Sequence, residues 1–91
     1  MFNITYNGLR IIVSDAAMRE LFKEYKTLLD VQKILVEGYV SPRRRGRDKI
    51  EMWFDKGNKT YEAVIVKDHN RFLNEDVWVL IHFGKFGRKE R

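Results

Sequence analysis

The sequence predicts an α+β domain with a β-hairpin, one or two helices and a three-stranded antiparallel β run, in the order β-β-α-α-β-β-β. Three observations support this order. Apolar residues alternate with polar ones near the N-terminus, recur at helical spacing in the middle, and form strand-like runs further on. With 91 residues, 44% of them apolar, and no cysteine, residues 1–91 are expected to form a single domain whose stability needs no disulfides.

The N-terminal segment predicts a β-hairpin. Apolar residues alternate on both sides of Asn7-Gly8, a dipeptide that accepts the positive φ angles of a type I′ turn. A two-residue loop places Tyr6 opposite Leu9 and Ile4 opposite Ile11. The apolar residues then share one face, so the turn and the hydrophobic pattern agree on the register.

The middle of the chain predicts two short helices or one bent helix. Ser14 or Asp15 caps the first stretch. Its expected buried stripe is Met18, Leu21, Phe22 and Tyr25. Thr27 and Asp30 have the spacing of a second capping signal, and Gly38 is expected at the C′ position that ends the helix. The second buried stripe is Leu28, Val31, Ile34 and Leu35.

Three strands are expected after the helices, at residues 50–55, 61–68 and 77–83. A turn at residues 56–59 joins the first two strands. Residues 68–76 are polar and predict a loop, and residues 84–91 predict a basic C-terminal tail. Helices are expected to cover one face of a mostly antiparallel sheet.

The segment from Thr27 to Phe83 resembles a known group of small domains. The matching pieces are Leu29-Asp30-Val31, Ile34-Leu35, Glu37-Gly38, the strand residues Tyr61 and Val64-Ile65-Val66, and Val77-Trp78-Val79-Leu80-Ile81. This pattern, over roughly two thirds of the chain, resembles the DUF4258 domains, which are themselves similar to RelE-type toxins that cleave messenger RNA. The resemblance implies a RelE-like fold, RNA as the target and an antitoxin-like protein partner. Such domains often have His-Ala at the start of the first helix, where this chain has Asp15-Ala16.

Positive charge is concentrated in two segments. The net charge is +5, and the loop before the first of the three strands holds Arg43, Arg44, Arg45, Arg47 and Lys49. The tail adds Lys85, Arg88, Lys89 and Arg91. Such clusters on a nearly neutral body indicate contact with phosphate, first of all that of a nucleic acid. The alternative is a solvated loop whose arginines pair with the protein's own acids, Glu51, Asp55 and Glu62.

His82 and Glu51 are the candidate catalytic residues. Metal-independent RNA cleavage needs a base, an acid and cations near the phosphate, and an imidazole or a carboxylate can exchange protons near neutral pH. Period-2 counting puts His82 on the side of Trp78 and Leu80. Glu51 shares the more polar face with Glu62 and Trp53. That face favours exposure of Trp53, and core packing is the alternative. The alternative for His82 is a hydrogen-bonded core histidine.

These features predict a small nucleic-acid-directed domain, RNA being favoured over DNA. It is either a RelE-like, metal-independent ribonuclease or an inactive relative; a non-catalytic DNA- or RNA-binding module and a protein-interaction domain remain alternatives. No cofactor is expected, and two histidines without cysteine make a protein-made metal site improbable. The sequence contains no membrane-spanning run, so the expected location is the cytoplasm.

Overall fold

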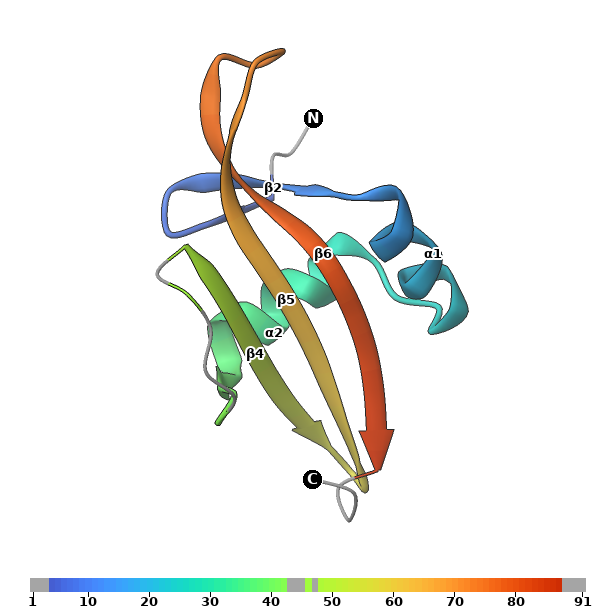
Figure 1. Cartoon of the computed structure of the whole chain (residues 1–91). Coiled ribbons are helices and arrows are strands. Elements are labelled where there is room, and N and C mark those ends of the chain that lie inside the picture. The colour runs from blue at the N-terminus through green and yellow to red at the C-terminus, as the bar shows by residue number, and fades with distance from the viewer. Residues whose placement is uncertain (1–3, 43–45, 47, 88–91) are drawn as a thin grey trace.

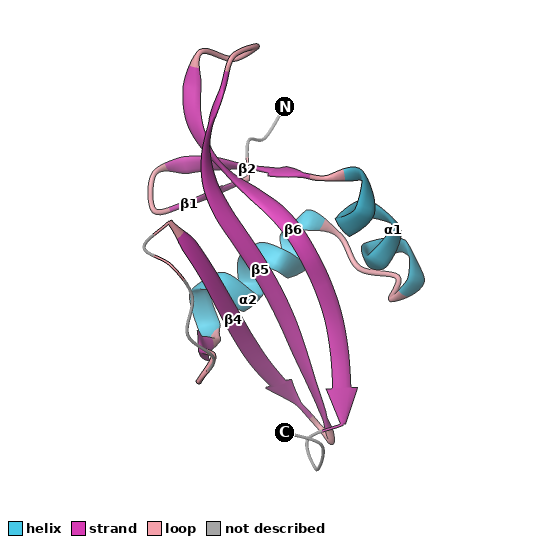
Figure 2. Cartoon of the chain, in the orientation of Figure 1, coloured by secondary structure: helices cyan, strands magenta, loops and turns pink. Residues whose placement is uncertain are grey.

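One mixed β-sheet with two helices makes up residues 4–42, 46 and 48–87, the part of the chain described by this computed structural model (Figure 1). The strands lie in the order β1-β2-β6-β5-β4-β3. Helix α2 crosses one face of the sheet, and α1 lies at the side of β6 (Figure 2). The elements are β1 Thr5–Tyr6, β2 Leu9–Val13, α1 Asp15–Lys23, α2 Leu28–Glu37, β3 Tyr39–Val40, β4 Lys49–Lys56, β5 Lys59–Asn70 and β6 Glu75–Gly87.

The predicted three-stranded run is wrong, although the fold is α+β. The order of elements is β-β-α-α-β-β-β-β, because β3 pairs antiparallel with β4. The N-terminal hairpin belongs to the same sheet, since β2 pairs in parallel with β6. Strand β3 has only two residues, too few for an alternating pattern to be detected, and no local signal marks a parallel pairing between segments this far apart in the chain.

The predicted loop at residues 68–76 is instead a continuation of the β5–β6 hairpin. His69 pairs with Asp76 and Asn70 with Glu75. These strands extend past their neighbours, so both faces meet solvent and no apolar alternation marks them. Residues 84–87 of the predicted tail are also strand, because β6 continues through Gly87. Residues 88–91 lie outside the described part of the chain.

The N-terminal hairpin is confirmed. Tyr6 pairs with Leu9, and the Ile11 N–H donates to the Ile4 carbonyl at 2.8 Å. Asn7 and Gly8 have φ angles of 51° and 81°, as a type I′ turn requires. The apolar residues of this hairpin pack against the core, so the predicted register places them correctly.

Two separate helices form, each with the expected cap. The Ser14 side chain accepts the Ala17 N–H at 3.1 Å. Thr27 and Asp30 form a capping box at the start of α2. Between the helices, Tyr25 has a φ of 53°, which breaks the helical path after α1.

The two predicted apolar stripes behave differently. In α2, Val31, Ile34 and Leu35 are buried as expected. In α1, the stripe prediction is wrong for three of its four residues, because Leu21 is buried while Met18, Phe22 and Tyr25 are exposed. The reason is the position of α1 beside the edge of β6, where Glu20 Oε1 accepts the Phe83 N–H at 3.1 Å. A helix beside an edge buries a narrower stripe than a helix on a sheet face.

Gly38 ends α2, but not in the left-handed conformation expected of a C′ glycine. Its φ is −80° and its ψ −168°, which is extended backbone. Glycine is needed because a Cβ atom here would overlap the carbonyl oxygens of Ile34 and Trp53. The absence of a side chain therefore allows the end of α2 to lie directly against β4.

Replacing Gly38 should test this close approach. We expect Gly38→Ala to lower the free energy of unfolding by about 1–3 kcal/mol, because backbone must move to admit the methyl group. Gly46→Ala is the control, since a Cβ there meets no atom within 4 Å. Urea denaturation measures both variants, and equal stabilities would contradict the explanation.

Candidate functional site

A β-bulge in β6 determines where His82 points. Val64 pairs with His82 but Ile65 pairs with Leu80, so Ile81 is an extra residue in β6. An extra residue reverses the alternation of side chains beyond it. His82 therefore lies on the face opposite Leu80, and the prediction that they share a side is wrong. Phe83, in turn, points into the core.

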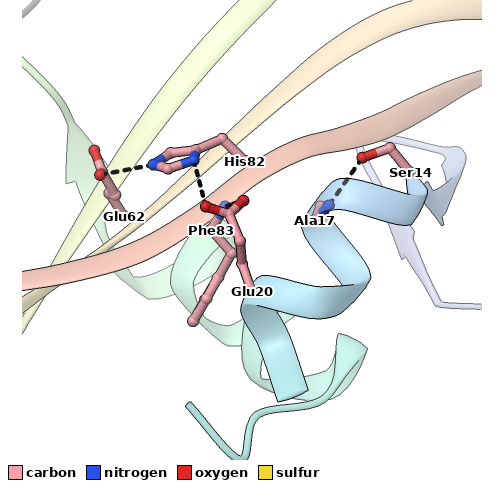
Figure 3. A network of polar contacts seen from close by, with 6 residues as sticks. All are labelled: Ser14, Ala17, Glu20, Glu62, His82 and Phe83. Atoms are coloured by element: carbon pink, nitrogen blue, oxygen red, sulfur yellow. Dashed lines mark hydrogen bonds and ion pairs between the residues drawn. The ribbon is translucent and has the colours of Figure 1, made fainter. Parts of the chain in front are cut away.

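The His82 imidazole is held between two carboxylates from different elements (Figure 3). Its Nε2 lies 2.9 Å from Glu62 Oε1 on β5, and its Nδ1 lies 2.9 Å from Glu20 Oε2 on α1. The His82 side chain is 44% exposed. This arrangement links α1 to the sheet while keeping the ring in contact with solvent.

Gly84 leaves room for this contact. It is the cross-strand partner of Glu62. A Cβ at Gly84 would lie 3.3 Å from Glu62 Oε1 and 3.4 Å from His82 Nε2. The first distance is tighter than ordinary van der Waals contact and the second is at its lower limit, so a side chain here would press on the Glu62 carboxylate.

Glu51, the other candidate catalytic residue, lies on the same face of the sheet as His82, but its surroundings are different. Val64 lies between them in the pairing of β4, β5 and β6, which separates their backbones by about 10 Å. Glu51 is only 1% exposed, and its Oε2 accepts the Trp53 indole N–H at 2.6 Å. The structure therefore does not bring Glu51 and His82 together at one accessible point.

Trp53 is buried, which agrees with the core-packing alternative and not with exposure. Its ring packs edge-on against Phe86, with the centroids 5.1 Å apart. Tyr39 packs on it in the same manner at 6.3 Å. These aromatic neighbours, which come from β6 and β3, cover a position that the sequence places among acids.

The predicted basic cluster is described only in part. Seven of its residues lie outside the described part of the chain: Arg43, Arg44, Arg45, Arg47, Arg88, Lys89 and Arg91. Lys49 begins β4, and Lys85 lies near the other end of the sheet, opposite Tyr61. The Lys85 ammonium is 2.8 Å from Glu24 Oε1, and this hydrogen bond raises the pKa of Lys85 above its usual 10.5.

A different cationic site lies between α2 and the turn of the β4–β5 hairpin. Its hollow has a volume of about 330 Å³, counting the part open to solvent. Three lysines surround it, and we call it the lysine pocket. It is lined by Lys26, Asp30, Lys33, Ile34, Phe54, Lys56 and Tyr61.

Aromatic rings hold two of these lysines in place. Lys26 Nζ lies 5.0 Å from the centroid of the Tyr61 ring. Lys33 Nζ lies 5.6 Å from the centroid of Phe54. Such cation–π contacts attract the ammonium group to the ring face. The rings therefore keep both charges at the pocket.

The lysine pocket carries net positive charge. Its three ammonium groups face one carboxylate, that of Asp30, so the balance is +2. Asp30 Oδ2 already accepts the Thr27 N–H at 2.8 Å in the capping box. The pocket is therefore suited to hold an anion.

Reasoning from the sequence missed the lysine pocket. The predicted hairpin register already placed Phe54 opposite Tyr61, and period-2 counting adds Lys56 to that face. That cluster of one lysine and two rings was the available signal. The contribution of Lys26 and Lys33 depends on how the helices lie over the sheet, which no local pattern specifies.

Within residues 4–42, 46 and 48–87, no group of three or more His, Cys, Asp or Glu side chains could hold a metal ion. In the same ranges no helix is long and apolar enough to cross a membrane.

Comparisons with family models, with curated proteins and with solved structures find no match to this chain. The resemblance to DUF4258 and RelE-type domains stays a prediction.

Removing the His82 ring should weaken the attachment of α1. We expect His82→Ala to lower the free energy of unfolding by about 1–3 kcal/mol, since two charge-assisted contacts are lost. His69→Ala is the matched control. That ring pairs with Asp76 at 3.0 Å where both side chains are about half exposed, so its loss should cost about 0–1 kcal/mol. Equal losses in urea denaturation would contradict a structural role for His82.

Proposed function

We propose that this protein is a small nucleic-acid-binding domain that holds phosphate groups of RNA in its lysine pocket. The observation that carries the proposal is the convergence of Lys26, Lys33 and Lys56 on one hollow. These lysines come from three separate parts of the chain. Lysines that are only solvated repel one another, so their convergence is unfavourable unless an anion binds between them. The proposal includes a cytoplasmic location, where RNA is available.

Phosphate is a better ligand for the pocket than a stacked base. The rings of Tyr61 and Phe54 each have an ammonium group over them, so a base stacking there would displace a lysine. Because the rings already restrain Lys26 and Lys33, less side-chain entropy is lost when a phosphate binds. A single strand suits the hollow because its backbone can bend into it.

The salt dependence of RNA binding tests this proposal. Each lysine that neutralises a phosphate of a single strand adds about 0.7 to the slope of log affinity against log salt. We expect the triple variant K26A/K33A/K56A to lose about 2 units of that slope. Fluorescence anisotropy with a labelled oligouridine of about 12 nucleotides gives the measurement.

Lys67→Ala is the matched control, because Lys67 is an exposed lysine in β5 outside the pocket. It should leave the slope unchanged. Circular dichroism checks that the triple variant folds. A folded triple variant with the wild-type slope would overturn the assignment of phosphate binding to the lysine pocket.

RNA cleavage is a second candidate function, favoured by the accessible imidazole between Glu20 and Glu62. In this reaction Glu20, the more exposed carboxylate, takes the proton of a 2′-hydroxyl. The 2′-oxygen bonds to the adjacent phosphorus, the bond from phosphorus to the 5′-oxygen breaks, and the leaving oxygen takes a proton from His82. Binding remains the first proposal because it needs only the lysine pocket.

Cleavage by this route leaves 2′,3′-cyclic phosphate and 5′-hydroxyl ends. We expect excess wild-type protein to produce these ends from single-stranded RNA, and His82→Gln to lose the activity while His69→Gln keeps it. Product ends are identified by mass spectrometry. No cleavage by excess wild-type protein would exclude this function and leave the binding proposal standing.

A further inference from the structure

The β5–β6 hairpin ends in an arm that carries a fully exposed aromatic side chain. We define the arm as Asp68–Asp76, the part that extends beyond the other strands (Figure 1). Phe72 in its turn is 99% exposed. The turn is held by the Leu73 N–H, which donates to Asn70 Oδ1 at 2.8 Å. An ordered turn therefore presents a phenyl ring to solvent.

A second apolar surface lies along α1, the turn after it and the start of α2. We call this surface the apolar strip, and its members are Met18, Phe22, Tyr25 and Leu29. Phe22 is 69% exposed and Tyr25 94%. Tyr25 also has a positive φ of 53°, a conformation that is unfavourable for a bulky residue. The chain therefore shows large apolar side chains on an outward surface, a feature that marks interaction sites.

The arm cannot reach the apolar strip of its own chain. Helix α1 is bonded to β6 at Phe83, whereas the arm begins at Asp76 and projects in the other direction, beyond β2 (Figure 1). Seven residues of extended strand separate these points, roughly 20 Å. Contact between the two surfaces therefore needs two molecules.

The two surfaces have opposite charge. The arm holds three carboxylates, Asp68, Glu75 and Asp76, against one guanidinium, Arg71. With His69 neutral, its formal charge is −2. Two of these acids already have partners, since Glu75 contacts Arg10 at 3.3 Å and Asp76 contacts His69 at 3.0 Å.

Residues 18–29, which carry the apolar strip, hold three cations, Arg19, Lys23 and Lys26, against two acids, a formal charge of +1. The acids in the same stretch are already engaged, Glu20 with His82 and Glu24 with Lys85. The strip is thus a cationic, apolar surface, and the arm is an acidic one with an apolar tip.

We propose that the protein associates with a second copy of itself, the arm of each molecule binding the apolar strip of the other. Phe72 and Leu73 cover Phe22 and Tyr25, and the acids of the arm face Arg19 and Lys23. Two such contacts around a twofold axis form a closed dimer. The acidic arm is a poor match for nucleic acid or an anionic membrane, which leaves a protein surface as its partner.

Sedimentation velocity with two complementary variants tests the proposal. Phe72→Asp disables the arm and Phe22→Asp disables the strip, so each variant alone should be monomeric at concentrations where the wild type is dimeric. An equimolar mixture should associate again, because the strip of the first variant and the arm of the second are intact. That mixed complex keeps one of two contacts and should bind at least tenfold more weakly than the wild type.

Val36→Asp is the matched control, because Val36 is an exposed apolar residue of α2 outside both surfaces. It should remain dimeric, and dimerisation of the wild type should strengthen at low salt. The proposal is overturned if wild-type protein is monomeric at millimolar concentration, if Phe72→Asp stays dimeric, or if the mixture of variants fails to associate. Circular dichroism confirms that each variant folds, since every substitution is at an exposed position.

Discussion

The β-bulge at Ile81 is the constraint on which the rest of the structure depends. From Val77 to Leu80, β6 has a partner on each side, since β2 pairs with it from Arg10 opposite Val77 to Val13 opposite Leu80. Beyond the bulge, β6 pairs only with β5, and its other edge is open. At that point the side chains also exchange faces. One extra residue thus separates a fully paired half-strand from a half-strand that needs another partner.

Helix α1 supplies that partner. An open edge presents backbone N–H and C=O groups that favour pairing with another chain. Glu20 accepts the Phe83 N–H with one oxygen and contacts His82 Nδ1 with the other. The bulge makes both contacts possible from one carboxylate, because it turns His82 outward next to the Phe83 N–H on the open edge of β6. The consequence of this position is that α1 buries only a narrow stripe and leaves Phe22 exposed.

The sequence predicts the parts of this fold that short-range chemistry determines. Asn7-Gly8 fixes a turn, and Thr27 with Asp30 fixes a helix start, so both features appear as expected. The bulge has no comparable signature, because Leu80, Ile81 and His82 read as an uninterrupted strand. The face of His82 was therefore predicted wrongly, and with it the setting of the candidate site. Gly38 was correctly predicted to end a helix, but the expected left-handed conformation was wrong. Glycine is needed there because of a close contact with Trp53, and that contact joins parts of the chain that are distant in sequence.

Lys26 connects the two proposed interactions. Its ammonium group lines the lysine pocket and lies over Tyr61, while the neighbouring residue, Tyr25, belongs to the apolar strip. An acidic arm bound to that strip brings negative charge close to Lys26, where it opposes a phosphate. Binding free energies are reciprocal, so phosphate in the pocket must weaken self-association by the same factor. If both proposals hold, RNA binding and self-association therefore compete in this protein, and the competition should fade as salt screens the charges.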